Sequence, residues 1–196
     1  MLNWLLIISI TMVSMTILMF LSAYIAILEP ATSFFGVSSR SKILLFSNSF
    51  NIFYLLISPL IFRILNKHYL PIVRIATFVT ALGCVGRYFY SNHYMGALVM
   101  SILVAIAHVP IITAPYGLLK LFNPGERGYA ASIPLFVPAL GINFCILYGM
   151  TYIASGIDVV DESVVSHHIN QLNLIIAIMG VISTIFTLYF LSKLEI

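Results

Sequence analysis

Six long apolar stretches follow one another along the chain, and short polar segments separate them. They cover residues 4–28, 43–65, 71–90, 95–122, 129–154 and 169–192. Each is near or above the about 20 residues that a helix needs to cross a ~30 Å hydrocarbon core. Because lipid offers the backbone no hydrogen-bond partner, such stretches must be helical. The pattern predicts an all-α membrane protein with six transmembrane helices in one domain, residues 1–196.

The composition supports this fold class and excludes others. Hydrophobic residues make up 61% of the chain and charged residues 8%, and the mean hydropathy is +1.09. A soluble domain carries about 25% charged residues, so most of the surface of this chain must face lipid. The net charge of +3 is scattered along the sequence. It forms no basic stripe of the kind that binds nucleic acid, so a nucleic-acid partner is not expected.

Basic residues divide unequally between the two sides of the predicted membrane protein. With the N-terminus inside, the inner side holds Arg63, Lys67, Arg74, Lys120, Arg127 and Lys193, and the outer side holds Arg40, Lys42 and Arg87. The excess on the inner side predicts that both termini are cytoplasmic. The plasma membrane is the default location, with an organelle membrane as the alternative. Longer loops are expected at residues 29–41 and 155–168, the second of which is acidic.

His108 is an ionisable residue about fourteen residues into the fourth span, near the middle of the membrane. Ionisable groups at this depth usually face the interior of a bundle or a water-filled path. One interpretation is that His108 lines a substrate cavity as a hydrogen-bond partner or proton acceptor. The other is a neutral histidine whose hydrogen bonds a neighbouring helix satisfies.

Prolines interrupt two consecutive spans at similar depth. Pro110 and Pro115 follow His108 in the fourth span, and Pro134 and Pro138 lie in the fifth. Each proline removes one backbone hydrogen bond and frees a carbonyl group. Kinked helices that rock or gate are one interpretation, and static packing kinks are the other.

Further polar groups lie within the apolar spans. Asn48 and Asn51 share one face of the second span, and Asn143 lies in the fifth. Hydrogen bonding between helices and the lining of a polar cavity are both possible roles for these amides. Tyr24, deep in the first span, is a candidate to face a cavity and to offer its ring to a cation.

The sequence contains no signature of an enzyme. It has no glycine-rich phosphate loop and no nucleophile or metalloprotease motif. His167 and His168, with Asp161 and Glu162 nearby, raise the question of a metal site. Adjacent histidines on a loop rarely converge on one ion, and no further ligand spacing supports such a site. We therefore expect neither catalysis, nor a metal, nor a cofactor.

The turn between the fourth and fifth spans carries a family resemblance. Its sequence, Phe-Asn-Pro-Gly-Glu-Arg-Gly-Tyr-Ala over residues 122–130, is similar to the aromatic, proline and Glu-Arg-Gly-x-Ala loop of the major facilitator superfamily. Six spans with both termini inside resemble the N-terminal half of such a transporter. The resemblance implies that Glu126 and Arg127 form part of a cytoplasmic gate. It also implies two inverted three-helix repeats, although no strong sequence repeat is visible.

Within that superfamily the chain resembles the feline leukaemia virus subgroup C receptor-related group, whose members carry haem, choline or ethanolamine. The matching positions, in order along the chain, are Trp4, Tyr24, residues 34–37, 59–62, 83–87, 107–109, Ile111 and Pro115. Leu21 replaces a substrate-facing tryptophan of the relatives, and His108 replaces a cavity glutamine. These departures count against choline, and histidine suits haem or another organic anion.

These observations lead to one functional hypothesis, which is transport of a small organic solute by alternating access. The expected substrate-binding residues are His108, Tyr24, Asn48, Asn51 and Asn143, and the expected gating residues are Pro110, Pro115, Glu126 and Arg127. Superfamily members have twelve spans, so a second copy or another six-helix half is the expected partner, alongside the lipid bilayer. The alternative hypothesis is a membrane scaffold or regulatory partner without transport activity, or a truncated transporter.

Overall fold

The structure is a computed structural model that describes residues 2–65, 67–154 and 162–194. Asn66 and the predicted loop acids Asp158 and Asp161 lie outside the described residues. In the part described, all regular elements are helical. They are α1 (Leu2–Ser22), η1 (Ile25–Ile27), α2 (Leu28–Phe35), α3 (Arg40–Leu65), α4 (Tyr69–Phe89), α5 (Tyr94–Leu118), η2 (Leu119–Leu121), α6 (Arg127–Tyr148), the π-helical turn η3 (Gly149–Ala154) and α7 (Glu162–Ser192).

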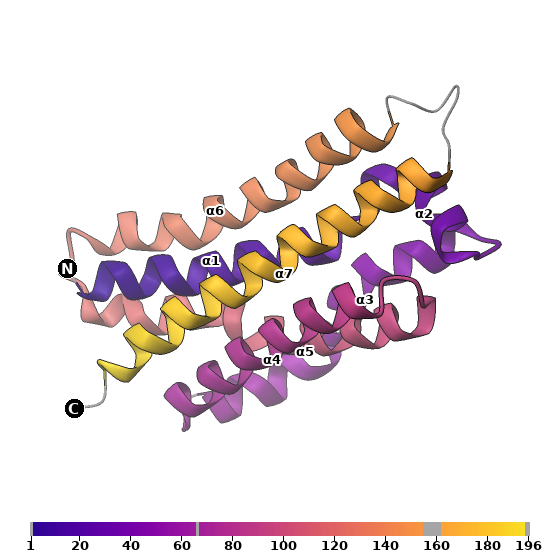
Figure 1. Cartoon of the computed structure of the whole chain (residues 1–196). Coiled ribbons are helices and arrows are strands. Elements are labelled where there is room, and N and C mark those ends of the chain that lie inside the picture. Colours follow the sequence, from indigo (N-terminus) through magenta and orange to yellow (C-terminus); the bar gives the residue numbers. More distant parts are fainter. Residues whose placement is uncertain (1, 66, 155–161, 195–196) are drawn as a thin grey trace.

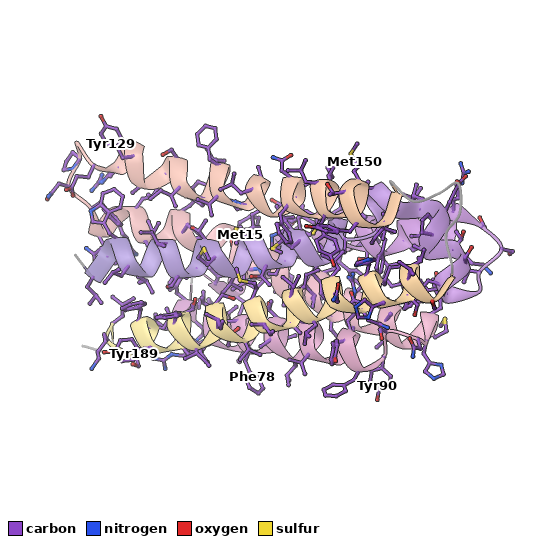
Figure 2. All side chains as sticks on the ribbon, turned by 45° about the horizontal axis from the view of Figure 1, so that its top comes forward. Met15, Phe78, Tyr90, Tyr129, Met150 and Tyr189 are labelled. Carbon is purple, nitrogen blue, oxygen red and sulfur yellow. The ribbon has the colours of Figure 1, made fainter. Side chains whose placement is uncertain are left out.

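Six helical stretches of the described chain are long and apolar enough to cross a membrane. They are Leu2–Phe35, Arg40–Leu65, Tyr69–Phe89, Tyr94–Leu121, Arg127–Ile153 and Ser163–Ser192. Their outward surfaces are largely apolar and aromatic, and Figure 2 shows Phe78, Tyr90 and Tyr129 projecting away from the bundle. Such surfaces suit contact with lipid. The prediction of an all-α, multi-pass membrane protein with six spanning helices is confirmed.

The first span differs from its predicted form, because the helix breaks near its end. α1 stops at Ser22, and a turn and η1 lead into α2, which occupies much of the loop predicted at residues 29–41. Pro30 lies in the first turn of α2, where its missing N–H costs no hydrogen bond. Gly36 ends α2 in the left-handed conformation (φ 61°), and its N–H bonds to the carbonyl of Ser33. The loop prediction was wrong because it followed apolarity alone.

The second predicted loop is also shorter than expected. α7 begins at Glu162, so His167 and His168 belong to a helix and not to a loop. The first turns of α7 are polar, and a pattern search for apolar residues misses them. A helix makes all its backbone hydrogen bonds internally, so it can continue beyond the apolar zone.

The helices form two three-helix units, one of α1, α3 and α4 and the other of α5, α6 and α7. The packing contacts of one unit are equivalent to those of the other. α1 packs against α5, α6 and α7, while α5 packs against α1, α4 and α3. Replacing α1 by α5, α3 by α6 and α4 by α7 converts the first set of neighbours into the second. The same replacement leaves the α4–α7 contact and the α1–α5 contact unchanged. Figure 1 shows α1 beside α6 and α7, with α3, α4 and α5 on the other side of the molecule.

The two units run in opposite directions through the bundle. Asn3, at the start of α1, donates a hydrogen bond to the carbonyl of Leu121, directly after α5. Arg74, near the start of α4, donates to the carbonyl of Leu191 near the end of α7. Both described chain ends therefore lie at one end of the bundle, here called the terminal end, and the opposite one is the distal end (Figure 1). Since α1 and α5 are antiparallel, the repeat is inverted.

Glycines permit the close helix contacts of this packing. A Cβ on Gly141 of α6 would lie 2.6 Å from the carbonyl oxygen of Met15 in α1. A Cβ on Gly86 of α4 would lie 2.6 Å from the sulfur of Met100 in α5, and one on Gly83 would collide with Val104. These distances are below van der Waals contact, and at Gly141 the obstructing atom belongs to the backbone, which cannot move aside as a side chain can.

Candidate functional site

His108 lies in the interior of the bundle, where α1, α3 and α5 meet. Its ring is 0% exposed, and its Nε2 lies 3.3 Å from the hydroxyl of Ser14 in α1. The ring of Phe50 in α3 lies 4.4 Å from the imidazole, centroid to centroid. His108 thus faces the interior and not lipid. No water-sized space touches it, so in this conformation it does not line an open cavity.

The imidazole of His108 is only half satisfied. Nδ1 is fully buried and has no hydrogen-bond partner among the described residues. A buried polar atom without a partner costs about 1–3 kcal/mol, so such atoms are rare in native structures. The pair of Ser14 and His108 joins α1 to α5, the two central helices of the repeat units.

The prolines of α5 lie directly after His108 and are buried. Thr113 donates its hydroxyl to the carbonyls of Val109 (3.2 Å) and Pro110 (3.1 Å) within the same turns. Thr113 lies between the two prolines, whose missing N–H groups leave the carbonyls of Ile106 and Ile111 without their helical donors. The helix continues through both prolines to Leu118. The weakened turn lies between the centre of the bundle and its terminal end.

Tyr24 follows the break after α1 at the distal end. It is 2% exposed, and its hydroxyl donates to Oδ1 of Asn173 in α7 (3.1 Å). The guanidinium of Arg87 in α4 lies 4.3 Å from the Tyr24 ring and 4.1 Å from the Phe20 ring. Tyr24 therefore does offer its ring to a cation, but that cation is an arginine of the same chain.

Arg87, which was predicted to lie on the outer side, lies at the distal end. Its side chain is 1% exposed, and the charge tally did not indicate this burial. Nη1 donates to the carbonyl of Phe20, and Nε donates to Oδ1 of Asn173 (3.3 Å). α1 ends at Ser22, so the cation neutralises free carbonyls at the negative end of that helix.

The sequence held a weak signal for this position of Arg87. Phe20 and Tyr24, one turn apart late in the first span, mark an aromatic face at the depth of the last turn of the third span. A tally of charges cannot say whether a guanidinium at a helix end points outward or inward. In the described part of the chain, no carboxylate pairs with Arg87.

The three candidate asparagines lie on the surface of the six-helix unit. Asn48 and Asn51 are exposed on α3, and Asn143 is exposed on α6. α3 and α6 are equivalent under the exchange of the two units, and both are the most peripheral helices. The structure does not bring these amides together with His108 or Tyr24. An amide that faced acyl chains would be costly, and these three amides lie at the surface of the described chain.

Glu126 and Arg127 lie in the turn between η2 and α6 at the terminal end. Asn123 donates to Oε2 of Glu126 (3.3 Å), and Arg127 donates to the carbonyl of Phe122 (3.1 Å). The side chains of the predicted gating pair thus form hydrogen bonds with residues of their own turn. Arg127 is exposed and Glu126 is half-buried, so both remain accessible to another surface.

The same turn is fastened to the first helix. The ring of Trp4 lies 4.9 Å from the ring of Phe122 in an edge-to-face arrangement. Next to it, Asn3 bonds to the carbonyl of Leu121 at 2.9 Å. Two contacts therefore join the start of α1 to the turn before α6. This links the predicted gate to the central helix that carries Ser14.

A cavity of about 650 Å³ opens at the terminal end, between α3, α4 and the end of α5. It is separate from the residues predicted to bind substrate, none of which lines it. Its wall consists of Tyr54, Phe62, Leu65, Tyr69, Leu70, Thr113, Tyr116, Gly117, Leu118, Lys120, Leu121 and Leu194.

His167 and His168 lie on α7, and His168 is 3.2 Å from the amide oxygen of Gln171. Among the described residues, no three His, Cys, Asp or Glu side chains form a group that could hold a metal ion.

Compared with known proteins, the chain matches no family model and no curated protein. The family resemblance therefore rests on the residues quoted from the sequence and stays a prediction.

Proposed function

We propose that the chain is a six-helix half of a major facilitator-type transporter that carries a small organic solute across a membrane by alternating access. The observation that supports this most is that the chain consists of two inverted three-helix units with equivalent packing contacts. Halves of this superfamily are built from such inverted repeats. The turn from Phe122 to Ala130, quoted from the sequence, agrees with the same assignment.

The centre of the repeat supplies the chemistry of the proposed path. α1 contributes Ser14 and α5 contributes His108, whose Nδ1 has no hydrogen-bond partner among the described residues. A solute group reaching this nitrogen would replace a hydrogen bond that the closed packing lacks. The weakened proline turn of α5 directly follows and provides a place where the helix can bend. Haem-like, choline-like and other small metabolites remain the candidate solutes.

A second six-helix unit completes the proposed transporter. The exposed faces of α3 and α6 carry Asn48, Asn51 and Asn143 among leucines and phenylalanines. A partner on these faces would enclose the amides in a shared polar path and remove them from lipid. A second copy of the chain would supply matching amides. Glu126 and Arg127 would then meet the partner at the terminal end and form the gate.

The orientation and location follow the distribution of basic residues. The terminal end holds most Lys and Arg residues, and this excess supports the proposal that both termini are cytoplasmic. The plasma membrane is the proposed location, and an organelle membrane is the alternative. In this orientation Arg87, Tyr24 and Asn173 form a closed layer at the external end of the path.

The test is an untargeted comparison of metabolite uptake between cells that express the chain and cells that do not. At least one solute should differ, and His108→Ala should lower its uptake about tenfold or more, the size of one lost hydrogen bond to a solute. Thr184→Ala is the matched control, because it removes a buried hydrogen bond (to the Thr77 carbonyl, 3.1 Å) between α4 and α7. Its uptake should stay within about twofold of the unmodified chain.

The alternative is a membrane scaffold without transport activity. The closed packing around His108 favours it, because no water-sized space reaches the ring. If no solute distinguishes the two kinds of cell, while the protein is present at normal levels, the transport proposal is wrong and the scaffold is favoured.

A further inference from the structure

The cavity at the terminal end has one polar wall. Thr113, Tyr116 and Lys120 follow one another at spacings of three and four residues through the end of α5 into η2. Side chains at these spacings share one helical face, so all three line the cavity. Lys120 is exposed and lies at the level where the helix ends. It makes no hydrogen bond or ion pair within the described chain.

The remaining walls are mainly apolar and well fixed. α3 contributes Phe62 and Leu65, and α4 contributes Tyr69. The Tyr69 hydroxyl donates to the carbonyl of Ala114 in α5 at 2.5 Å. Its ring lies so close to α5 that a Cβ on Gly117 would be 2.8 Å from it. The cavity is therefore held open by rigid contacts between α4 and α5.

The chemistry of the cavity is that of a receptor for an anion with an apolar tail. One ammonium group and the free phenol groups of Tyr54 and Tyr116 are available to bind oxygen atoms. None of the described lining residues is acidic. The floor is made of leucine and phenylalanine side chains. A volume of about 650 Å³ lies within the range of roughly 300–1,000 Å³ that is typical of small-molecule sites.

The cavity also lies where a membrane lipid can reach it. It is at the ends of spanning helices, and its lining residues Phe62 and Leu65 are neighbours in sequence of the exposed residues Arg63, in the last turn of α3, and Lys67. Basic pockets between transmembrane helices on the cytoplasmic side bind anionic lipid headgroups. A soluble anion would use Lys120 but would leave the apolar floor unoccupied.

We propose that this cavity binds one anionic phospholipid, whose phosphate pairs with Lys120 and whose acyl chain lies along Phe62, Leu65 and Leu121. The lipid bridges α3 and α5 at the terminal end. It therefore holds the weakened proline turn of α5 against its neighbour. This site does not depend on the identity of the transported solute, or on transport at all.

The experiment measures how many lipid molecules stay bound when the full chain is purified in detergent and mixed with vesicles of known composition. Phosphatidylglycerol should be retained in preference to phosphatidylcholine, and Lys120→Gln should lower its retention about fivefold, the effect of one basic residue near the membrane surface. Lys193→Gln is the matched control, because Lys193 lies at the same end, 5.5 Å from the Tyr189 ring, and does not line the cavity. Lys120→Arg should retain the lipid.

Two outcomes would overturn the proposal. Equal retention of phosphatidylglycerol by the Lys120→Gln and Lys193→Gln proteins would remove Lys120 from any lipid site. Complete displacement of the lipid by inorganic phosphate, at a concentration equal to that of the lipid, would identify a site for free anions. Lys120 is exposed, so neither substitution is expected to impair folding, and a thermal unfolding curve of each variant checks this.

Discussion

At the scale of single residues, the guanidinium of Arg87 joins three helices at the distal end. It bonds to the last turn of α1 and to Asn173 of α7 while its own backbone belongs to α4. Two rings lie within 4.3 Å of it. A buried cation without an acidic partner is costly, so these contacts must offset its desolvation.

Replacing Arg87 by alanine should therefore destabilise the protein. The change leaves the Phe20 carbonyl without its side-chain donor and removes two hydrogen bonds to a charged group together with the ring contacts. We expect a loss of about 3 kcal/mol or more, measured by unfolding of the purified protein in detergent.

Arg40→Ala is the control, because Arg40 pairs with Glu29 on the surface, where its side chain is 64% exposed. Its cost should be about 1 kcal/mol or less. Equal costs for the two substitutions would mean that the buried guanidinium contributes no more than a surface charge.

The same scale shows what could be found from the sequence and what could not. His108 was recognised because a histidine in an apolar span stands out, and it does face the interior. Arg87 was missed because its position at a helix end is compatible with both outward and inward side chains. Tyr24 was expected at a cavity, and its ring instead contacts the chain's own cation. Residue type indicates which groups are costly in lipid, while their partners depend on other helices.

At the scale of elements, close backbone contacts decide which helices are neighbours. α6 crosses α1 at Gly141, where no room exists for a side chain. The equivalent contact in the other unit is between α3 and α5. Lipid is as apolar as the side chains, so burial away from lipid gives membrane helices little hydrophobic stabilisation. Close van der Waals packing between the helices stabilises them instead.

Gly141→Ala should consequently lower stability by about 1–3 kcal/mol, because the added methyl group collides with the Met15 carbonyl. The measurement is again unfolding in detergent. Gly128→Ala, near the start of the same helix, is the matched control. A Cβ there has no atom within 4 Å, so its effect should be near zero or slightly stabilising. A neutral Gly141→Ala would show that α6 is free to shift away from α1.

At the scale of the whole molecule, the two broad faces differ in what they demand. The outer surfaces of α3 and α6 carry the exposed amides Asn48, Asn51 and Asn143, whereas those of α4 and α7 expose Ile75, Phe78 and Ile185. The exposed apolar side chains of α4 and α7 suit contact with lipid. Under the proposed function, a second six-helix unit covers the exposed amides of α3 and α6.

Cysteine cross-linking in membranes tests this difference. The native Cys84 and Cys145 are buried and should not react. Leu55→Cys, on α3, should form covalent dimers or adducts with a partner, because its side chain is 76% exposed on the face proposed to be covered. Ile75→Cys on α4, where the side chain is 64% exposed, is the control and should stay monomeric on a denaturing gel. Equal cross-linking at both positions would argue against a specific interface.

The sequence by itself determined that the chain has six membrane-spanning helices, because uninterrupted apolar stretches of about 20 residues or more suit helices, whereas the strands of a membrane barrel are shorter and alternate between apolar and polar residues. Only the tertiary structure decided which helices are neighbours, that Arg87 is buried and that Asn48 and Asn143 are exposed. The physical reason is that lipid and protein interior are both apolar. A spanning helix is therefore hydrophobic on all sides, and the apolar pattern does not indicate which side faces its neighbours.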